Sequence, residues 1–117
     1  MNIYWPTRTL QEQILMKWID AGKADEILDN TMIEVDTGAT AILLVKSNRE
    51  FFAVSAVCPH HQAWFIQGRV DGTSLHCPRH MGAFDMKSGR LLSGPSCGDL
   101  PCYPVRIENG KVLIKSE

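Results

Sequence analysis

Beyond residue 30, short apolar and β-branched runs alternate with turn residues along the whole chain. Runs of this length, rich in Val, Ile, Thr and aromatic residues, are typical of β-strands. Between them, Asp36-Thr37-Gly38 and Ser47-Asn48 mark turns, and Asp71-Gly72 and Asn109-Gly110 are strong two-residue hairpin signals. The pattern predicts strands over 32–35, 40–45, 51–57, 83–85, 90–92, 103–108 and 111–115, with a further pair meeting at the first hairpin through Val70 and Leu75.

Helical spacing is confined to the first quarter of the chain. Thr9 and Glu12 have the spacing of a capping box, and apolar residues recur after them at the intervals of one helical face. We expect a second short helix over 24–28, with Asn30 near its end. The recurring apolar residues are Leu10, Ile14, Leu15 and Trp18, and the first helix is expected to pack on the body of the protein through Leu10, Ile14 and Trp18.

Taken together, the elements predict an all-β fold, because many short strands separated by tight turns are typical of antiparallel sandwiches and barrels. The chain has 117 residues, which is the length of one domain. Its composition is 44% apolar and 21% charged, as in ordinary globular proteins. We therefore expect a single compact core with little helix.

Charge and hydropathy exclude two classes of partner. The formal net charge is −1, so no basic surface for nucleic acid is expected. No run of about 18 apolar residues is present, so no membrane span is expected. Residues 1–10 lack the apolar run of a signal peptide, and we expect a cytoplasmic protein. In that compartment the four cysteines are expected as thiols or metal ligands and not as a disulfide framework.

Two short motifs each pair one cysteine with one histidine. The first runs from Cys58 to His60, the second runs from Cys77 to His80, and the Asp71-Gly72 hairpin lies between them. A single hairpin can therefore bring both motifs to one place. Structural zinc usually takes two like ligands from each arm, whereas these arms each supply one thiolate and one imidazole. Such arms suit a mixed-ligand diiron centre, in which one iron takes both cysteines and the other both histidines. Zinc at the same four residues remains the alternative.

The spacing Cys-x-His, sixteen residues, Cys-x-x-His resembles the Rieske family. This resemblance covers about residues 16–116, so the chain divides into an extension, 1–15, and one Rieske [2Fe–2S] domain, 16–117. It implies a β-sandwich base carrying a small cluster-binding subdomain, with a third loop, 94–96, beside the cluster. Further family-like residues are Trp18-Ile19, Phe51-Phe52-Ala53-Val54, Gly68-Arg69-Val70, Phe84-Asp85, Gly89, Gly94-Pro95 and 100–105.

Four positions indicate which branch of the Rieske family the chain resembles. Rieske proteins of cytochrome bc complexes have a disulfide between the ligand loops, where this chain has Ala63 and Arg79. They also place a serine and a tyrosine hydroxyl against the cluster, where this chain has Gly82 and Phe84. The chain is therefore more similar to bacterial Rieske ferredoxins of multicomponent oxygenases. Those ferredoxins often have glycine at the places of Gln62 and Met81, and this difference leaves the subclass of oxygenase open.

Other chemically active residues have alternative interpretations. His61 could replace His60 as a ligand, but the family pattern favours His60. His76 is expected at the surface. Cys97 and Cys102 are expected as free thiols near the third loop, although their spacing also permits a disulfide.

Two groups of side chains bear on what the protein exposes at its surface: apolar residues near the ligand motifs and a group of acidic residues. Trp64, Met81 and Pro95 either form an apolar docking rim or fill the core under the ligand loops, and the sequence leaves both open. Six acidic residues in the first third of the chain are expected on a solvated face: Asp20, Asp25, Glu26, Asp29, Glu34 and Asp36.

The resemblance implies an electron carrier and not an enzyme. Such a carrier takes one electron from an NAD(P)H-dependent flavoprotein reductase and passes it to a terminal oxygenase, docking transiently at the cluster tip. An alternative is a fixed subunit of a larger redox enzyme, such as the small subunit of an assimilatory nitrite reductase.

Overall fold

The structure, a computed structural model, describes residues 18–38, 40–59, 63–78, 82–94 and 98–115. Within these residues it is almost entirely antiparallel β-structure, and the all-β prediction is confirmed. No helix in the described part of the chain is long and apolar enough to span a membrane. The elements are β1 (Trp18–Lys23), η1 (Ala24–Glu26), β2 (Thr31–Asp36), β3 (Ala41–Ser47), β4 (Glu50–Ser55), η2 (Phe65–Gln67), β5 (Arg69–Asp71), β6 (Ser74–His76), β7 (Ala83–Asp85), β8 (Leu91–Ser93), β9 (Cys102–Tyr103), β10 (Val105–Glu108) and β11 (Lys111–Lys115).

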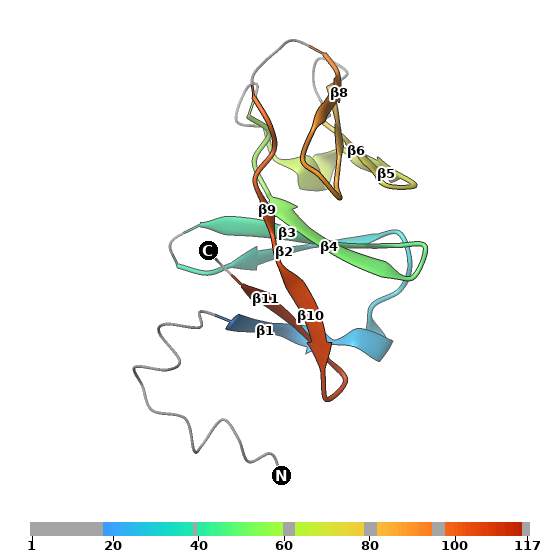
Figure 1. Ribbon diagram of the computed structural model, residues 1–117, viewed down its shortest axis with the longest axis vertical. Helices are drawn as coiled ribbons and strands as arrows, with labels where there is room; N and C mark the ends of the chain where they lie inside the picture. The colour runs from blue at the N-terminus through green and yellow to red at the C-terminus, as the bar shows by residue number, and fades with distance from the viewer. Residues whose placement is uncertain (1–17, 39, 60–62, 79–81, 95–97, 116–117) are drawn as a thin grey trace.

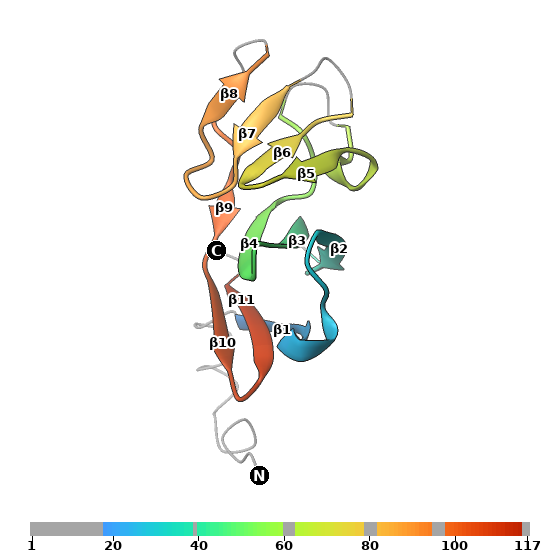
Figure 2. The ribbon, with the colours of Figure 1, turned by 90° about the vertical axis from the view of Figure 1, so that its right-hand side faces the viewer.

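The strands form a base and a smaller subdomain. In the base, the sheet β2-β3-β4-β9 lies beside the sheet β1-β11-β10. A third sheet, β5-β6-β7-β8, lies at one end of the long axis, as both views show (Figures 1 and 2). We call the described residues between 56 and 94 the small subdomain.

Strand β3 separates two hydrophobic cores. Because successive side chains of a strand point to opposite faces, Ile42 and Leu44 pack toward β11, whereas Leu43 and Val45 pack toward the small subdomain. All four are almost fully buried. The small subdomain is therefore built directly on the second face of the base sheet, and the two parts share one core.

Turns also join the two parts. Ser47, at the end of β3, is buried, and its hydroxyl donates to the Gly72 carbonyl oxygen at 2.7 Å. Lys87 Nζ, in the β7–β8 turn, lies 3.8 Å from Glu50 Oε1 at the start of β4. These contacts fix two hairpin turns of the small subdomain against the β3–β4 turn of the base.

The N-terminal helix prediction is wrong where the structure tests it. Trp18 opens β1 and pairs with Lys115 of β11. This pairing with a distant strand overrides the local helical spacing. Thr9, Leu10, Glu12, Ile14 and Leu15 lie outside the described residues.

Other elements differ in extent from the prediction. The helix expected over 24–28 is one 3₁₀ turn, Ala24–Glu26, and η2 adds a second such turn beyond the first quarter. The strand expected over 103–108 is split, because Pro104 lacks the N–H of a continuous ladder: Tyr103 pairs with β4 and Val105 pairs with β11. The other predicted strands are confirmed to within a few residues.

The β7–β8 turn is held by Asp85. The Ser88 hydroxyl donates to Asp85 Oδ2 at 2.7 Å, and the Lys87 and Ser88 amides also donate to this carboxylate. The Ser88 hydrogen bond is the largest cause of a pKa of Asp85 below its ordinary value of 3.8, and the amides and the Lys87 charge act in the same direction against a smaller desolvation effect. The ionised carboxylate therefore stabilises the fold.

Replacing Asp85 with asparagine should lower the thermal midpoint at pH 7 by a small amount, since the carboxylate is largely exposed. Because the folded pKa lies below the unfolded value, this stabilisation is present above pH 3.8 and is lost as the pH falls through the folded pKa. Thermal unfolding of wild type and Asp85→Asn at a series of pH values checks this. A difference in midpoint that stays constant down to pH 2.5 would contradict it.

Candidate metal centre

Cys58 lies where the chain leaves β4 and begins the first ligand loop. Its amide donates to the Ala63 carbonyl oxygen at 2.7 Å, and the flanking residues Val57 and Trp64 form an antiparallel bridge. The loop is thus closed at its base by backbone pairing. Cys58 has 0% of its surface exposed.

Cys77 lies at the start of the second ligand loop, as Cys58 does in the first. It follows β6, and its amide donates to the Gly82 carbonyl oxygen at 2.8 Å, beside the pairing of His76 with Ala83. Cys77 is 6% exposed. In both loops the cysteine amide is therefore bonded to the residue five positions later, so the two loops have matching closures.

His60 and His80 lie outside the described residues. In the sequence they stand two residues after Cys58 and three after Cys77, between the cysteine and the carbonyl that closes each loop. His61, Gln62, Arg79, Met81, Pro95, Ser96 and Cys97 also lie outside the described residues.

The two cysteines share one core. Both belong to the buried cluster of the small subdomain, together with Phe65, Phe84 and Leu75. Thiols buried among apolar side chains suit a soft metal, since thiolate is the liganding form and needs a cation beside it in such surroundings. The structure thus gathers the two predicted iron ligands that it describes, and their donor chemistry fits an iron–sulfur centre.

Gly82 and Phe84 are both buried beside the second loop. Phe84 is fully buried and packs edge-to-face on Phe65, with ring centroids 5.9 Å apart. Gly82 contributes its carbonyl oxygen to the closure of the loop. Neither residue has a side-chain hydroxyl.

Cys102 occupies a separate site. It lies in β9 of the base and carries a free thiol, which confirms this part of the prediction for Cys97 and Cys102. Its Sγ lies 3.6 Å from the Met86 carbonyl oxygen, and burial, with smaller effects of Asp85 and Asp99, raises the pKa of the thiol. We infer that Cys102 is not a cluster ligand.

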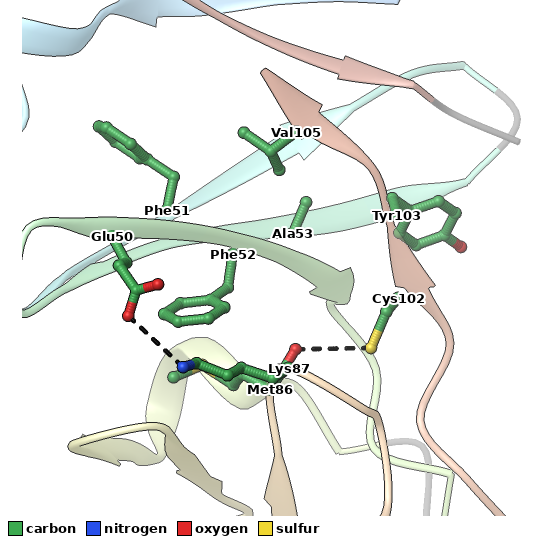
Figure 3. Close-up of a pocket in the computed structure, with 9 residues that line it drawn as sticks. All are labelled: Glu50, Phe51, Phe52, Ala53, Met86, Lys87, Cys102, Tyr103 and Val105. Atoms are coloured by element: carbon green, nitrogen blue, oxygen red, sulfur yellow. Dashed lines mark hydrogen bonds and ion pairs between the residues drawn. The ribbon is translucent and has the colours of Figure 1, made fainter. Parts of the chain in front are cut away.

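An open groove lies at the junction of base and small subdomain, and Cys102 is one of the residues that line it (Figure 3). It has a volume of about 360 Å³, and the Glu50–Lys87 ion pair crosses between its two sides. The groove therefore belongs to the junction between the two parts and not to the ligand loops. Its lining residues are Glu50, Phe51, Phe52, Ala53, Met86, Lys87, Cys102, Tyr103 and Val105.

The structure tests three expectations about surface residues. His76 is partly buried, with Nε2 3.3 Å from the Ser74 hydroxyl oxygen, so it is not a simple surface residue. The six residues of the acidic group are all exposed, as expected, and Asp20 Oδ2 lies 3.0 Å from Lys111 Nζ in an ion pair at the surface. Trp64 is 46% exposed, which favours the docking rim over the core for this side chain.

The backbone closures of the ligand loops were missed in the sequence, because carbonyl oxygens carry no sequence signal. Each cysteine is followed five positions later by a small residue, Ala63 or Gly82. This equal spacing is the one sequence pattern that could have suggested the closures.

Comparisons with known proteins agree with this site. A family model described as the Rieske [2Fe-2S] domain matches residues 17–104. The ferredoxin component of the naphthalene 1,2-dioxygenase/salicylate 5-hydroxylase systems of Ralstonia sp. is 35% identical over 100 residues, which cover 86% of this chain and 96% of that protein. The ferredoxin component of the alkene monooxygenase system of Xanthobacter autotrophicus is 31% identical and covers 100% of this chain and 93% of its own length.

Among solved structures, one of a complex of reduced oxygenase and oxidised ferredoxin in carbazole 1,9a-dioxygenase contains a similar chain. Its TM-score is 0.82 at 27% identity, and the match covers 87% of this chain and 95% of the other. With the matched family model, these similarities extend over nearly the whole domain. This chain therefore belongs to the Rieske [2Fe-2S] domain family, and its cofactor is a Rieske-type [2Fe–2S] cluster.

Proposed function

We propose that this chain is the ferredoxin of an oxygenase system, carrying one electron at a time from an NAD(P)H-dependent flavoprotein reductase to a terminal ring-hydroxylating or related oxygenase. The observation that carries this proposal is the similarity to oxygenase ferredoxin components over 96% of the length of one of them. The chain is then an electron-transfer component and not itself an enzyme. We place it in the cytoplasm, where NAD(P)H is available and thiols stay reduced.

Four residues are proposed as cluster ligands. Cys58 and Cys77 would hold one iron, and His60 and His80 the other. The matching closures of the two loops support this set, because each places one buried cysteine at the base of a loop that contains one of the histidines. The bound group supplies a reversible one-electron couple. The apolar core shields the cysteine side from water, and we propose the two imidazoles as the exit for the electron.

A second candidate concerns the class of oxygenase. The alkene monooxygenase ferredoxin aligns with the whole of this chain, including residues 1–17, whereas the naphthalene relative covers 86% of it. This difference favours a monooxygenase partner. The nitrite reductase small subunit of Mycobacterium tuberculosis shares the fold at 22% identity, which gives no support for that function.

Reconstitution tests the proposed function. The purified holoprotein is combined with NADH, a flavoprotein reductase and, in turn, the terminal oxygenases of alkene monooxygenase, naphthalene 1,2-dioxygenase and carbazole 1,9a-dioxygenase. We expect product formation that depends on this chain with at least one oxygenase. If the chain accepts electrons from the reductase and supports none of them, the proposed function is wrong.

The reduction potential should lie at the low end of the Rieske range, about −150 mV. Hydrogen bonds to the cluster sulfurs stabilise the reduced state, and neither Gly82 nor Phe84 supplies a hydroxyl for this purpose. The paired change Gly82→Ser with Phe84→Tyr should raise the potential by roughly 60 mV or more, because a tenfold stabilisation of the reduced state corresponds to about 59 mV. Direct voltammetry checks both values.

Gly82→Ala is the matched control, since it adds a Cβ without a donor and should leave the potential near that of the wild type. A wild-type midpoint above about +100 mV lies in the upper part of the Rieske range. That result would show that the absence of serine and tyrosine hydroxyls at positions 82 and 84 does not determine the reduction potential.

A further inference from the structure

Large apolar side chains are exposed at both ends of the molecule. Trp64 and Leu92 belong to the small subdomain, and Leu28 and Ile107 belong to the base. Trp64 is the residue among them that adjoins a ligand loop directly: it is paired through its backbone with Val57, the neighbour of Cys58. The indole of Trp64 is therefore carried by the backbone segment that pairs beside the buried Cys58.

The backbone on both sides of Trp64 is held by hydrogen bonds. The Cys58 amide bonds to Ala63, and the Phe65 amide bonds to the Ala56 carbonyl oxygen at 3.0 Å, so the residues on both sides of Trp64 are held. Phe65, the next residue, is fully buried, whereas Trp64 is 46% exposed. An exposed aromatic side chain on a held backbone loses little conformational freedom on binding, which is a property of anchors in protein interfaces.

The exposed area of the Trp64 side chain is a substantial share of a transient redox interface. Redox partners bury less than about 1,200 Å² in total, or about 600 Å² on each side. Nearly half of an indole side chain provides roughly 100 Å² of this. Leu92, in β8 of the same subdomain, is a second exposed apolar side chain.

We propose that Trp64 is the apolar anchor by which the terminal oxygenase docks on this ferredoxin, with an apolar hollow of the oxygenase receiving the indole. This inference rests on the proposed function. The oxygenase is chosen because the similar ferredoxin of carbazole 1,9a-dioxygenase has been solved in complex with its oxygenase.

Steady-state kinetics with Trp64→Ser tests the proposal. The assay uses the oxygenase that the wild-type chain reduces in the reconstitution, and it varies the ferredoxin concentration. The KM for ferredoxin should rise about tenfold or more, while kcat at saturation, the visible spectrum and the reduction potential stay at their wild-type values. A role confined to folding or to the cluster would instead change the spectrum or the potential.

Leu28→Ser is the matched control, because Leu28 is 73% exposed and lies between η1 and β2 in the base, not in the small subdomain. Its KM should stay within twofold of the wild type. If Trp64→Ser does not retain the cluster, Trp64→Phe is measured in its place and should show a smaller rise in KM.

A wild-type KM in the cluster-bearing Trp64 variant would overturn the proposal. So would an equal rise in Leu28→Ser, or a rise in KM for the reductase and not for the oxygenase. Failure of the wild-type chain itself would instead count against the proposed function.

Discussion

Replacing Cys77 with serine should remove the visible absorption of the protein and most of its iron. Cys77 is buried at the closure of the second ligand loop and shares a core with Cys58. A serine hydroxyl in this apolar site is a far weaker ligand than thiolate, since iron–sulfur clusters are held by cysteine thiolates. Cys58→Ser should give the same result, and so should alanine at either His60 or His80.

The cluster should also contribute to folding. A metal centre that forms only in the folded chain adds its binding free energy to the stability, so Cys77→Ser should unfold at a lower denaturant concentration than the holoprotein. Iron and sulfide analysis with the absorption spectrum measures the first effect, and chemical denaturation measures the second.

Cys102→Ser is the control for general effects of losing a thiol. Its Sγ contacts the Met86 carbonyl oxygen in the base–subdomain junction, away from the ligand loops, so the variant should keep its iron and its spectrum. His61→Ala should keep them as well. A Cys77→Ser protein with wild-type iron content would show that the ligand set is wrong.

Alanine at Gly68 should destabilise the protein by about 3 kcal/mol or more, at the upper end of what overpacking usually costs. A Cβ at this position would overlap the carbonyl oxygen of His76. The atoms that the added Cβ would meet belong to the backbone, so no flexible side chain can move aside. Gly68 is also held by its amide, which donates to the Phe65 carbonyl oxygen at 2.7 Å.

The clash lies next to the ligand loop. Arg69 pairs with His76, which directly precedes Cys77, so forcing Gly68 away from His76 separates β5 from β6 where the second ligand begins. We therefore expect Gly68→Ala to lose cluster occupancy as well as stability. The free energy of unfolding by urea and the ratio of iron to protein measure the two effects.

Gly72 provides a control at the other end of the same hairpin. Its φ is +62°, and an added Cβ meets nothing within 4 Å, so Gly72→Ala bears only the conformational cost of about 1–2 kcal/mol. Cluster occupancy should be unchanged in this variant. Equal losses in the two variants would mean that the contact with His76 is not what requires glycine at position 68.

Local signals predicted much of this fold. Asn109-Gly110 placed the β10–β11 hairpin correctly, and the alternating and β-branched runs located β2, β3 and β4 to within two residues. The turn expected at Asp71-Gly72 is displaced by one residue, because Asp71 pairs with Ser74 and leaves Gly72 and Thr73 as the turn. Turn chemistry and strand propensity act between neighbours in the sequence, so a single sequence reveals them.

Features that depend on distant residues could not be predicted in this way. β1 pairs with β11 at the other end of the chain, and no local property of Trp18 reveals that partner. The bond from Ser47 to Gly72, which joins the base to the small subdomain, also depends on tertiary structure. The close approach of Gly68 to His76 is a third example.

For the metal centre, the four ligands were predicted from spacing and from resemblance. The structure adds the burial of Cys58 and Cys77 and the matching closures at Ala63 and Gly82. These backbone contacts are independent of side-chain identity, which is why the sequence did not indicate them.

Coulometric reduction of the purified protein, combined with iron, sulfide and zinc analysis of the same sample, tests the central claim most directly. The account predicts uptake of one electron per chain, with two irons and two acid-labile sulfides and no stoichiometric zinc. A colourless protein that contains one zinc per chain and takes up no electron would contradict it.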